Sequence, residues 1–229
     1  MANESATAEA FVNAVLAQSI DFKSVTFFAV LDNVSTDRTL DILTNLAKEK
    51  PPLRVVWAPS NRCVVDAYIL GYREALNAGC NWILEIDAGF SHQPSDMPKF
   101  FDKMAQGYDC VFGSRFCKSG KSKGGSLKRY IISRGGTLLT NLLLGTKLSD
   151  MTSGFQLFTC HAVEHFLQKG IYSRGHFFQT EIKVHCRNLQ ITEVPIHYRN
   201  PSPSVNNSVL IDALNNLWRL FRLRLAGAL

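Results

Sequence analysis

Short apolar runs alternate along the chain with segments whose apolar residues recur at helical spacing. The runs are rich in β-favouring residues, as expected of strands covered on both faces; they are Val25–Leu31, Leu53–Trp57, Trp82–Ile86, Cys110–Phe112 and Ile191–Ile196. Helical spacing predicts helices at Glu9–Ala17, Thr39–Lys48, Asp66–Asn77 and Lys128–Leu144, and Ser95 is expected to cap another near Pro98. This alternation predicts an α/β fold with a mostly parallel sheet and helices on both faces.

Two carboxylates come directly after predicted strands. Asp32 follows Val25–Leu31, and Asp87 follows Trp82–Ile86. Ligands of parallel sheets bind beyond the carboxyl ends of the strands. A carboxylate there can accept hydrogen bonds from a ligand or hold a divalent cation such as Mg²⁺ or Mn²⁺ against a diphosphate. Two plainer interpretations stay open: the segment after Asp32 caps the next helix, and Asp87 is a solvated turn residue before Gly89.

A third polar segment, which follows the predicted strand Cys110–Phe112, is basic. Arg115 closes that strand, and residues 118–134 contain six cations and no carboxylate. On the helix in this stretch, Arg129 and Ser133 are four residues apart and share a face. Arginine is suited to bidentate contact with phosphate. The segment therefore predicts an anion site, and the alternative is a solvated basic loop beside an exposed helix face.

Charge and composition limit the kinds of ligands and surfaces that the chain is expected to bind. The net charge is +6 and 46% of the residues are hydrophobic, which suits one domain with a substantial core and favours anionic ligands or surfaces. No nucleic-acid-binding signature occurs, so we expect no nucleic-acid partner. No apolar stretch reaches the roughly 18 residues of a membrane-spanning helix, and no signal-peptide pattern occurs near Met1. We therefore expect a cytoplasmic chain, either soluble or peripheral on the cytoplasmic face of a membrane.

The end of the chain predicts an amphipathic basic helix at Val209–Leu225. Three arginines lie among its apolar residues, together with Trp218 and Phe221. Such a helix either packs on the domain or lies in the interface of an anionic leaflet, where it could also bind a small membrane subunit. The expected division is a domain at 1–205 followed by this helix at 206–229.

Seven short motifs occur in a fixed order along the chain. They are Leu31 to Asp37, Asp87 to Phe90, Gly113 to Arg115, Ser133 to Gly135, Thr152 to Phe155, Phe178 to Glu181 and Glu193 to Ile196. The ordered set resembles family 2 glycosyltransferases and, within them, dolichol- or polyprenol-phosphate mannose synthases. This resemblance covers nearly the whole chain and implies a single GT-A nucleotide-diphospho-sugar transferase domain.

The resemblance also implies roles for individual residues. The donor-binding positions are Asn3, Glu4, Asp32, Asp87 and Arg199. Asp32 would contact the nucleotide base, Asp87 the metal ion and the donor diphosphate, and Arg199 the donor phosphates.

Other positions would serve the acceptor and the reaction. Arg115, Arg129 and Ser133 would bind the acceptor's lipid phosphate. Gln179 and Glu181 match a motif at the active-site cleft, so the positions implied as catalytic are these two together with Asp87 and Arg115.

The implied reaction is an inverting transfer of a hexose, such as mannose, from a nucleotide-diphosphate sugar to a polyprenyl or dolichyl phosphate. The acceptor phosphate is already an anion near pH 7, so catalysis would rest on positioning two polyanions and neutralising the leaving diphosphate. Two alternatives stay open: a catalytically impaired relative that still binds nucleotide sugar, and a family 2 transferase with a saccharide acceptor.

Three departures from the family pattern change the expected site. Family members begin with an apolar strand and a turn, of which only the last two residues, Asn3 and Glu4, are matched. We therefore expect a sheet without its first strand and a base pocket without one wall, and an apolar strand encoded upstream of Met1. Gly89 replaces the second aspartate of the metal motif, and Val34 stands at a glycine position of the first turn, which implies a changed turn.

Overall fold

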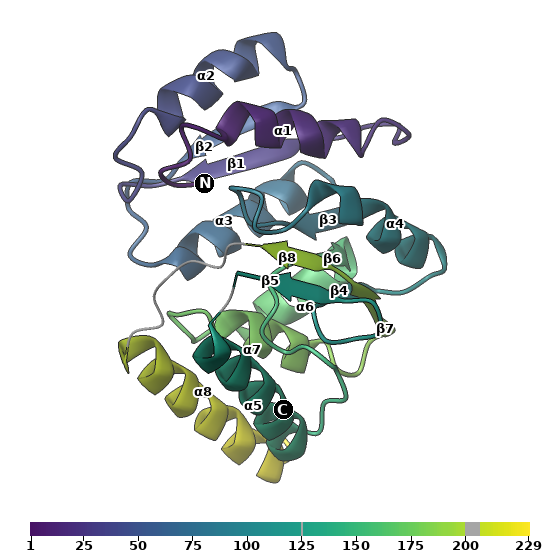
Figure 1. Cartoon of the computed structure of the whole chain (residues 1–229). Helices are drawn as coiled ribbons and strands as arrows, with labels where there is room; N and C mark the ends of the chain where they lie inside the picture. The colour runs from purple at the N-terminus through teal and green to yellow at the C-terminus, as the bar shows by residue number, and fades with distance from the viewer. Residues whose placement is uncertain (125, 200–206) are drawn as a thin grey trace.

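The computed structural model describes residues 1–124, 126–199 and 207–229 (Figure 1). The strands are β1 (Phe27–Leu31), β2 (Leu53–Trp57), β3 (Trp82–Glu85), β4 (Cys110–Ser114), β5 (Lys121–Lys123), β6 (Gln156–Thr159), β7 (Ile191–Pro195) and β8 (His197–Arg199). The helices are α1 (Ala8–Ala17), α2 (Thr39–Glu49), α3 (Val64–Asn77), α4 (Met97–Ala105), α5 (Leu127–Leu144), α6 (Cys160–Lys169), α7 (Phe178–His185) and α8 (Asn207–Leu225). The strand–helix alternation predicted from the apolar pattern is confirmed.

The described strands form three small sheets. β1 and β2 pair in parallel, β3, β6, β4 and β7 lie in that order in a mixed sheet, and β5 pairs in parallel with β8. Within the mixed sheet β6 runs antiparallel to both β3 and β4, whereas β4 and β7 are parallel. The prediction of a mostly parallel arrangement therefore holds for three of the five strand pairings, and β6 is the exception.

A wide gap separates β1 from β3. These strands belong to different sheets, and residues of both, including Phe28 of β1 and Trp82 of β3, line one cavity of about 1720 Å³. The amino group of Met1 donates a hydrogen bond to the carbonyl of Val30, so the start of the chain reaches the β1 edge that faces the gap. Burial lowers the pKa of this amino group. The expectation of a further strand at this place stays a prediction.

Helices cover both faces of the sheets (Figure 1). α1 and α2 pack with β1 and β2, and their buried residues form a small core that includes Leu31 and Leu43. The largest core joins α3, α6, α7 and α8 with the mixed sheet, from which it takes in Phe112 of β4 and Phe158 of β6. Of the strands predicted from apolar runs, β4 is buried along its whole length, whereas β1, β2, β3 and β7 are partly covered.

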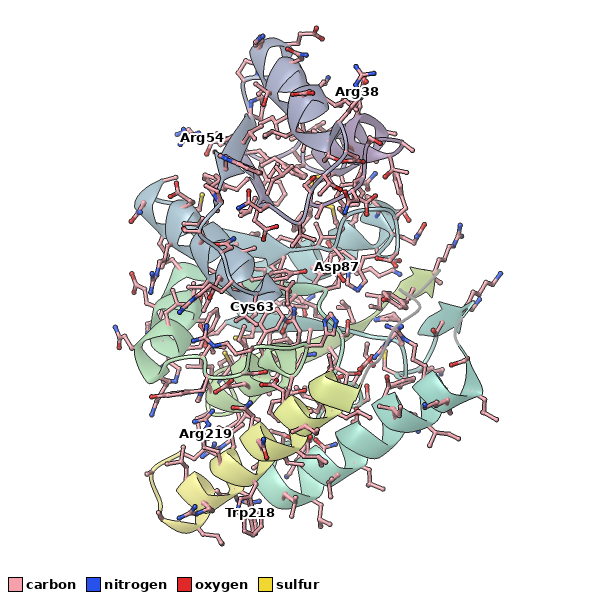
Figure 2. The ribbon with its side chains drawn as sticks, turned by 90° about the vertical axis from the view of Figure 1, so that its left-hand side faces the viewer. Arg38, Arg54, Cys63, Asp87, Trp218 and Arg219 are labelled. Atoms are coloured by element: carbon pink, nitrogen blue, oxygen red, sulfur yellow. The ribbon has the colours of Figure 1, made fainter. Side chains whose placement is uncertain are left out.

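The helix α8 packs on the domain. Leu217 and Leu220 are buried in the largest core, while Trp218 remains 59% exposed and points away from the molecule (Figure 2). α5 and α8 lie side by side in both views. Their C-terminal ends are joined by Arg224, which donates to the carbonyl oxygens of Leu142 and Leu143 at the end of α5. None of the described helices is long and apolar enough to cross a bilayer.

Some local predictions were wrong or incomplete. Ser95 lies inside a 3-10 turn, Pro94–Asp96, and makes no cap to α4, because α4 begins only at Met97. The segment expected as a glycine- and lysine-rich loop contains β5. The sequence pattern also missed β6, α6, α7 and β8, of which β6 and β8 have only four and three residues.

Candidate active site

One cavity collects most of the predicted site residues. It is lined by Glu4, Asp32, Asp87, Arg115, Arg129, Ser133 and Gln179. These side chains come from opposite halves of the chain, and Figure 2 shows Asp87 between the part that carries β1 and β2 and the part that carries α5 and α8. The remaining predicted residues, Asn3, Glu181 and Arg199, do not line the cavity.

Asp87 lies two residues beyond the end of β3 and is held by its neighbours. Its carboxylate accepts a short hydrogen bond from the hydroxyl of Tyr68 on α3. Its backbone N–H donates to Nδ1 of His92 at 3.3 Å. Burial lowers the pKa of His92, so this imidazole stays neutral near pH 7 and does not form an ion pair with Asp87 although the two side chains lie 3.6 Å apart. The Asp87 carboxylate, 35% exposed, faces the cavity as a negative charge.

The carboxylate of Glu4 lies against Gly89, two residues after Asp87. Gly89 has a φ of +75°, and a Cβ built on it would lie 2.6 Å from Oε1 of Glu4. The Glu4 carboxylate thus occupies the space that a side chain at position 89 would need. It also accepts a hydrogen bond from the Thr7 hydroxyl at 2.6 Å. A carboxylate from the start of the chain therefore lies where the first side-chain atom of the expected aspartate would be.

The turn that carries Asp32 is held by Asn3. Asn3 Nδ2 donates to the carbonyl of Val34 at 2.9 Å, and Asn3 Oδ1 accepts from the backbone N–H of Thr36 at 3.0 Å. One Asp32 oxygen accepts from the Val34 N–H. Val34 is not among the residues with positive φ, so it is accommodated at this position without left-handed backbone. Asn3 contributes to this side of the site by shaping the turn.

Arg115 is fixed by a buried carboxylate. Its Nε and Nη2 donate to the two oxygens of Asp150 at 2.7 and 2.9 Å, and its backbone N–H donates to the same carboxylate. Burial favours a raised pKa for Asp150, but the pairing with Arg115 and the nearby charge of Lys183 together lower that pKa to about 2. The guanidinium also lies over the rings of Phe116 and Tyr198. Arg115 is therefore a rigid, charged group at the cavity wall.

The loop that carries Asp150 is itself held by hydrogen bonds to Glu193 and Lys183. Both oxygens of Glu193 on β7 accept hydrogen bonds from the Ser149 N–H, at 3.0 and 2.8 Å, and one of them also accepts from the Asp150 N–H. The buried Lys183 donates to the carbonyl oxygens of Asp150 and Ser153, and burial lowers its pKa to about 8. The motifs around Asp150 and Glu193 thus serve to place Arg115.

Gln179 belongs to a buried polar network under Asp87. Its Nε2 donates to Glu85, and its Oε1 accepts from Gln156, both by short hydrogen bonds. Burial raises the pKa of Glu85 to about 8, so this carboxyl is mostly protonated near pH 7. A Cβ at Gly154 would lie 2.9 Å from the Gln179 amide, which explains why a residue without a side chain stands there.

Two predicted residues lie elsewhere. Glu181 is fully buried and accepts hydrogen bonds from the backbone N–H groups of Tyr172 and Ser173 and from Arg219 of α8. It holds a loop and a helix together and does not reach the cavity. Arg199 is exposed at the end of β8, where its backbone N–H donates to the carbonyl of Ser91.

The sequence interpretation assigned no role to four residues that build this site. They are Tyr68, Glu85, Asp150 and Lys183. One signal was available for Glu85, because a carboxylate inside an apolar strand two residues before Asp87 must find partners on folding. For the others the contact partners are distant in the chain. Among the described residues no group of three or more His, Cys, Asp or Glu side chains is placed to hold a metal ion by itself.

The fold and the convergence of these motifs agree with the comparison with known sequences. The profile of the family described as "Glycosyl transferase family 2" matches residues 1–167. The chain belongs to this family.

Two curated relatives carry more specific names. The chain is 32% identical over 171 residues to an undecaprenyl-phosphate mannosyltransferase of Micrococcus luteus, covering 74% of this chain and 70% of that protein. It is 27% identical over 172 residues to a polyprenol monophosphomannose synthase of Mycolicibacterium smegmatis, covering 74% of this chain and 65% of that protein. The resemblance inferred from the ordered motifs is confirmed.

Solved structures confirm the GT-A type of α/β fold. Glucosyl-3-phosphoglycerate synthase of Mycobacterium tuberculosis in complex with UDP superposes with a TM-score of 0.67 at 16% identity, covering 97% of this chain and 78% of that one. The same enzyme with Mn²⁺, UDP-glucose and phosphoglyceric acid gives a TM-score of 0.62 at 18% identity, covering 100% of this chain and 75% of that one.

Proposed function

We propose that this chain transfers a hexose, with mannose as the first candidate, from a nucleotide-diphosphate sugar to a polyprenyl phosphate. The observation that carries the proposal is the shared cavity, in which Asp32 and Asp87 lie with Arg115, Arg129 and Ser133. Such a site can hold two phosphate-bearing substrates at once. The names of both curated relatives support a polyprenyl phosphate as the acceptor.

The carboxylates form the donor side. In this proposal Asp32 contacts the base, and Asp87 together with Glu4 would hold a divalent cation whose remaining ligands are diphosphate oxygens and water. Mg²⁺ in nucleotide sites is usually held by one or two carboxylates and by phosphate oxygens. Mn²⁺ is an alternative cation, because structures of glucosyl-3-phosphoglycerate synthase contain it together with the nucleotide. When bound, the cation would neutralise charge on the leaving diphosphate.

The cations form the acceptor side. Arg115, fixed by Asp150, and Arg129 and Ser133 on α5 would orient the lipid phosphate. A phosphate oxygen forms the bond to the anomeric carbon from the face opposite the diphosphate, and the bond from that carbon to the diphosphate oxygen breaks, with the electron pair leaving on the nucleoside diphosphate. A phosphate monoester has its second pKa near about 6, so its attacking oxygen needs no general base at pH 7.

A second candidate is a protein that binds nucleotide sugar without turning it over. Gly89 favours it, because the residue lacks a carboxylate that the metal motif would otherwise supply. The position of the Glu4 carboxylate against Gly89 favours the transferase, because it returns a carboxylate to that place.

One assay separates the candidates. The protein is incubated with labelled GDP-mannose or UDP-glucose, a polyprenyl phosphate and Mn²⁺ or Mg²⁺, and the product is partitioned between organic and aqueous phases. Metal-dependent label in the organic phase supports the proposal. Donor binding without turnover supports the second candidate, and turnover into a water-soluble product supports a saccharide acceptor. Both outcomes contradict transfer to a lipid.

We also propose that α5 and α8 bring the site to a membrane surface. Both helices carry large hydrophobic side chains that are more than half exposed; they are Leu127, Tyr130, Ile131, Leu138 and Leu142 on α5 and Ile211, Leu214, Trp218 and Leu225 on α8. Exposed basic residues lie on the same helices. A surface of this kind suits the interface of an anionic leaflet, where a polyprenyl phosphate resides.

A further inference from the structure

Two tyrosines of α3 donate hydrogen bonds to carboxyl groups at and just beyond the end of β3. The Tyr68 hydroxyl donates to Oδ1 of Asp87, and the Tyr72 hydroxyl donates to Oε2 of Glu85. The tyrosines are four residues apart and therefore share one face of the helix. The contact of Tyr68 with Asp87 is thus one of a matching pair that ties α3 to this part of the chain.

The position of the Tyr68 hydroxyl is fixed by the packing of its ring. The ring lies against that of Phe178 on α7, with the two centroids 4.9 Å apart, and belongs to the side chains packed on the largest core. Tyr68 also lines the cavity that holds Asp87. The hydroxyl is therefore held at the Asp87 carboxylate before any ligand enters.

This contact makes the two oxygens of Asp87 different. An ionised carboxylate only accepts hydrogen bonds, so the Tyr68 hydroxyl is the donor and Oδ1 is engaged. Nδ1 of His92 lies 3.6 Å from Oδ2, but it accepts the backbone N–H of Asp87 and carries no proton for that oxygen. Within the described part of the chain no other side chain donates to Oδ2, so Asp87 offers one free oxygen to the cavity.

The same division occurs at Glu4. Its Oε2 accepts a hydrogen bond from the Thr7 hydroxyl at 2.6 Å, while Oε1 lies 2.6 Å from the place that a Cβ at Gly89 would take. Each of the two carboxylates proposed to hold the cation therefore has one oxygen engaged by a hydroxyl group. Neither is arranged to give both oxygens to one ion.

Divalent cations differ in how they use carboxylates. Ca²⁺ takes about six to eight oxygen ligands and often binds both oxygens of a carboxylate, whereas Mg²⁺ requires a smaller octahedral shell that includes several waters. Mn²⁺ also accepts an octahedral shell of oxygens. Carboxylates that offer one oxygen each suit Mg²⁺ and Mn²⁺ and deprive Ca²⁺ of the two-oxygen ligands that fill its larger shell.

We propose that Tyr68 is a positioning residue that makes Asp87 a one-oxygen ligand and so selects Mg²⁺ or Mn²⁺ over Ca²⁺, with Thr7 acting in the same way on Glu4. The inference rests on the proposed function for the presence of a cation at Asp87. It adds which residues decide the kind of cation, and by what contact.

Tyr68→Phe and Tyr72→Phe form a matched pair of variants. Each removes one hydroxyl from the same face of α3 and keeps the aromatic ring, so the packing of the helix is preserved. Tyr68→Phe frees an oxygen of Asp87, whereas Tyr72→Phe frees an oxygen of Glu85. Thr7→Val, which keeps the shape of the side chain, makes the corresponding change at Glu4.

The measurement is calorimetric titration of the protein with GDP, and separately with UDP, in an excess of Mn²⁺ or of Ca²⁺. The excess loads the nucleotide with metal, so the affinities report the preference of the protein between the two metal–nucleotide complexes. Wild type and Tyr72→Phe are expected to prefer the Mn²⁺ complex by about tenfold or more. In Tyr68→Phe this preference should fall to about threefold or less through tighter binding of the Ca²⁺ complex, and in Thr7→Val it should also shrink.

A second measurement observes the carboxylates themselves. In infrared difference spectra of the Ca²⁺ complex, the separation of the two carboxylate stretching bands is expected to become smaller in Tyr68→Phe, as for two-oxygen binding, and to stay unchanged in Tyr72→Phe. The inference is overturned if wild type has no preference for Mn²⁺, if it binds neither complex, or if Tyr68→Phe retains the preference of Tyr72→Phe.

The outcome is separable from that of the proposed function, because the titration contains no acceptor. A cation preference that depends on Tyr68 in a protein without transfer activity supports the inference and contradicts the transferase. Transfer to polyprenyl phosphate by a protein whose cation preference does not depend on Tyr68 overturns the inference and leaves the transferase standing.

Discussion

Asp150 holds Arg115 through two side-chain hydrogen bonds, from Nε at 2.7 Å and from Nη2 at 2.9 Å. Both side chains are almost fully buried, so the pair is shielded from water. The carboxylate aligns the guanidinium before any substrate arrives, which is the kind of preorganisation that stabilises developing or bound charge without reorganisation. The position of Arg115 at the cavity wall thus depends on a carboxylate that does not itself line the cavity.

This pair predicts a specific acid sensitivity. The pKa of Asp150 is lowered to about 2 in the folded protein, against about 3.9 in an unfolded chain. A depressed carboxyl pKa stabilises the fold above about pH 4, and that contribution, about 2 to 3 kcal/mol, is lost as the pH falls towards 2. Asp150→Asn should therefore be less stable than the wild type at pH 7 in urea unfolding, with a difference that shrinks below pH 4.

The control for this measurement is Asp102→Asn, an exposed carboxylate on α4. It should leave the stability near the wild-type value at pH 7. A pH-independent difference between Asp150→Asn and the wild type would contradict the assigned ion pair.

Glu4 is predicted to contribute to cation binding. Glu4→Gln keeps the shape of the side chain but removes a negative charge beside Asp87, so Mn²⁺ affinity in the presence of nucleoside diphosphate should fall about tenfold. Glu9→Gln, an exposed change on α1, should have no such effect. Mn²⁺ binding followed by electron paramagnetic resonance gives the comparison, and equal affinity in Glu4→Gln and wild type would remove Glu4 from the site.

The gap between β1 and β3 predicts stabilisation by an added strand. Six Val- and Ile-rich residues fused before Met1 can extend along the β1 edge that the Met1 amino group already reaches, pairing backbone groups and burying apolar surface. The melting temperature should rise by at least about 5 °C relative to a fusion of six Gly and Ser residues. Identical melting temperatures for the two fusions would show that the gap does not accept a strand.

Trp218 is predicted to contribute to membrane contact. Trp218→Glu removes an exposed aromatic ring from α8 and adds a negative charge, so sedimentation with vesicles rich in anionic lipid should drop severalfold. Asn215→Glu adds the same charge to an exposed position on the same helix and isolates the effect of the ring. If both variants lose the same fraction of binding, the ring itself has no role at the membrane.

Much of the fold followed from local patterns. The run at Leu53–Trp57 gave β2 with the observed bounds, and the helix predicted at Lys128–Leu144 begins one residue earlier as α5. Buried strands and amphipathic helices can be recognised in the sequence because burial fixes the spacing of their apolar residues. β5, with three exposed polar residues, exists only because β8 lies beside it, so no local pattern could reveal it.

The candidate site was predictable where a residue ends a strand. Asp32, Asp87 and Arg115 each follow the carboxyl end of a strand and line one cavity, although Asp32 follows a strand of a different sheet from the other two. The residues that hold this site in place could not be predicted from the same rule. Asp150 and Glu193 hydrogen-bond to residues that lie 35 and 44 positions away in the chain. The prediction for Glu181 failed for the same reason. Its motif suggested a place in the cleft, but its carboxylate accepts hydrogen bonds from Ser173 and Arg219 instead.

Steady-state transfer kinetics of two variants test the central claim, that one cavity holds the donor and the lipid phosphate on separate groups. Asp87→Ala should abolish metal-dependent donor binding and transfer. Arg129→Ala should raise the KM for polyprenyl phosphate about tenfold and leave the KM for the nucleotide sugar within twofold. Retained activity in Asp87→Ala, or an Arg129→Ala effect confined to the donor, would contradict this account.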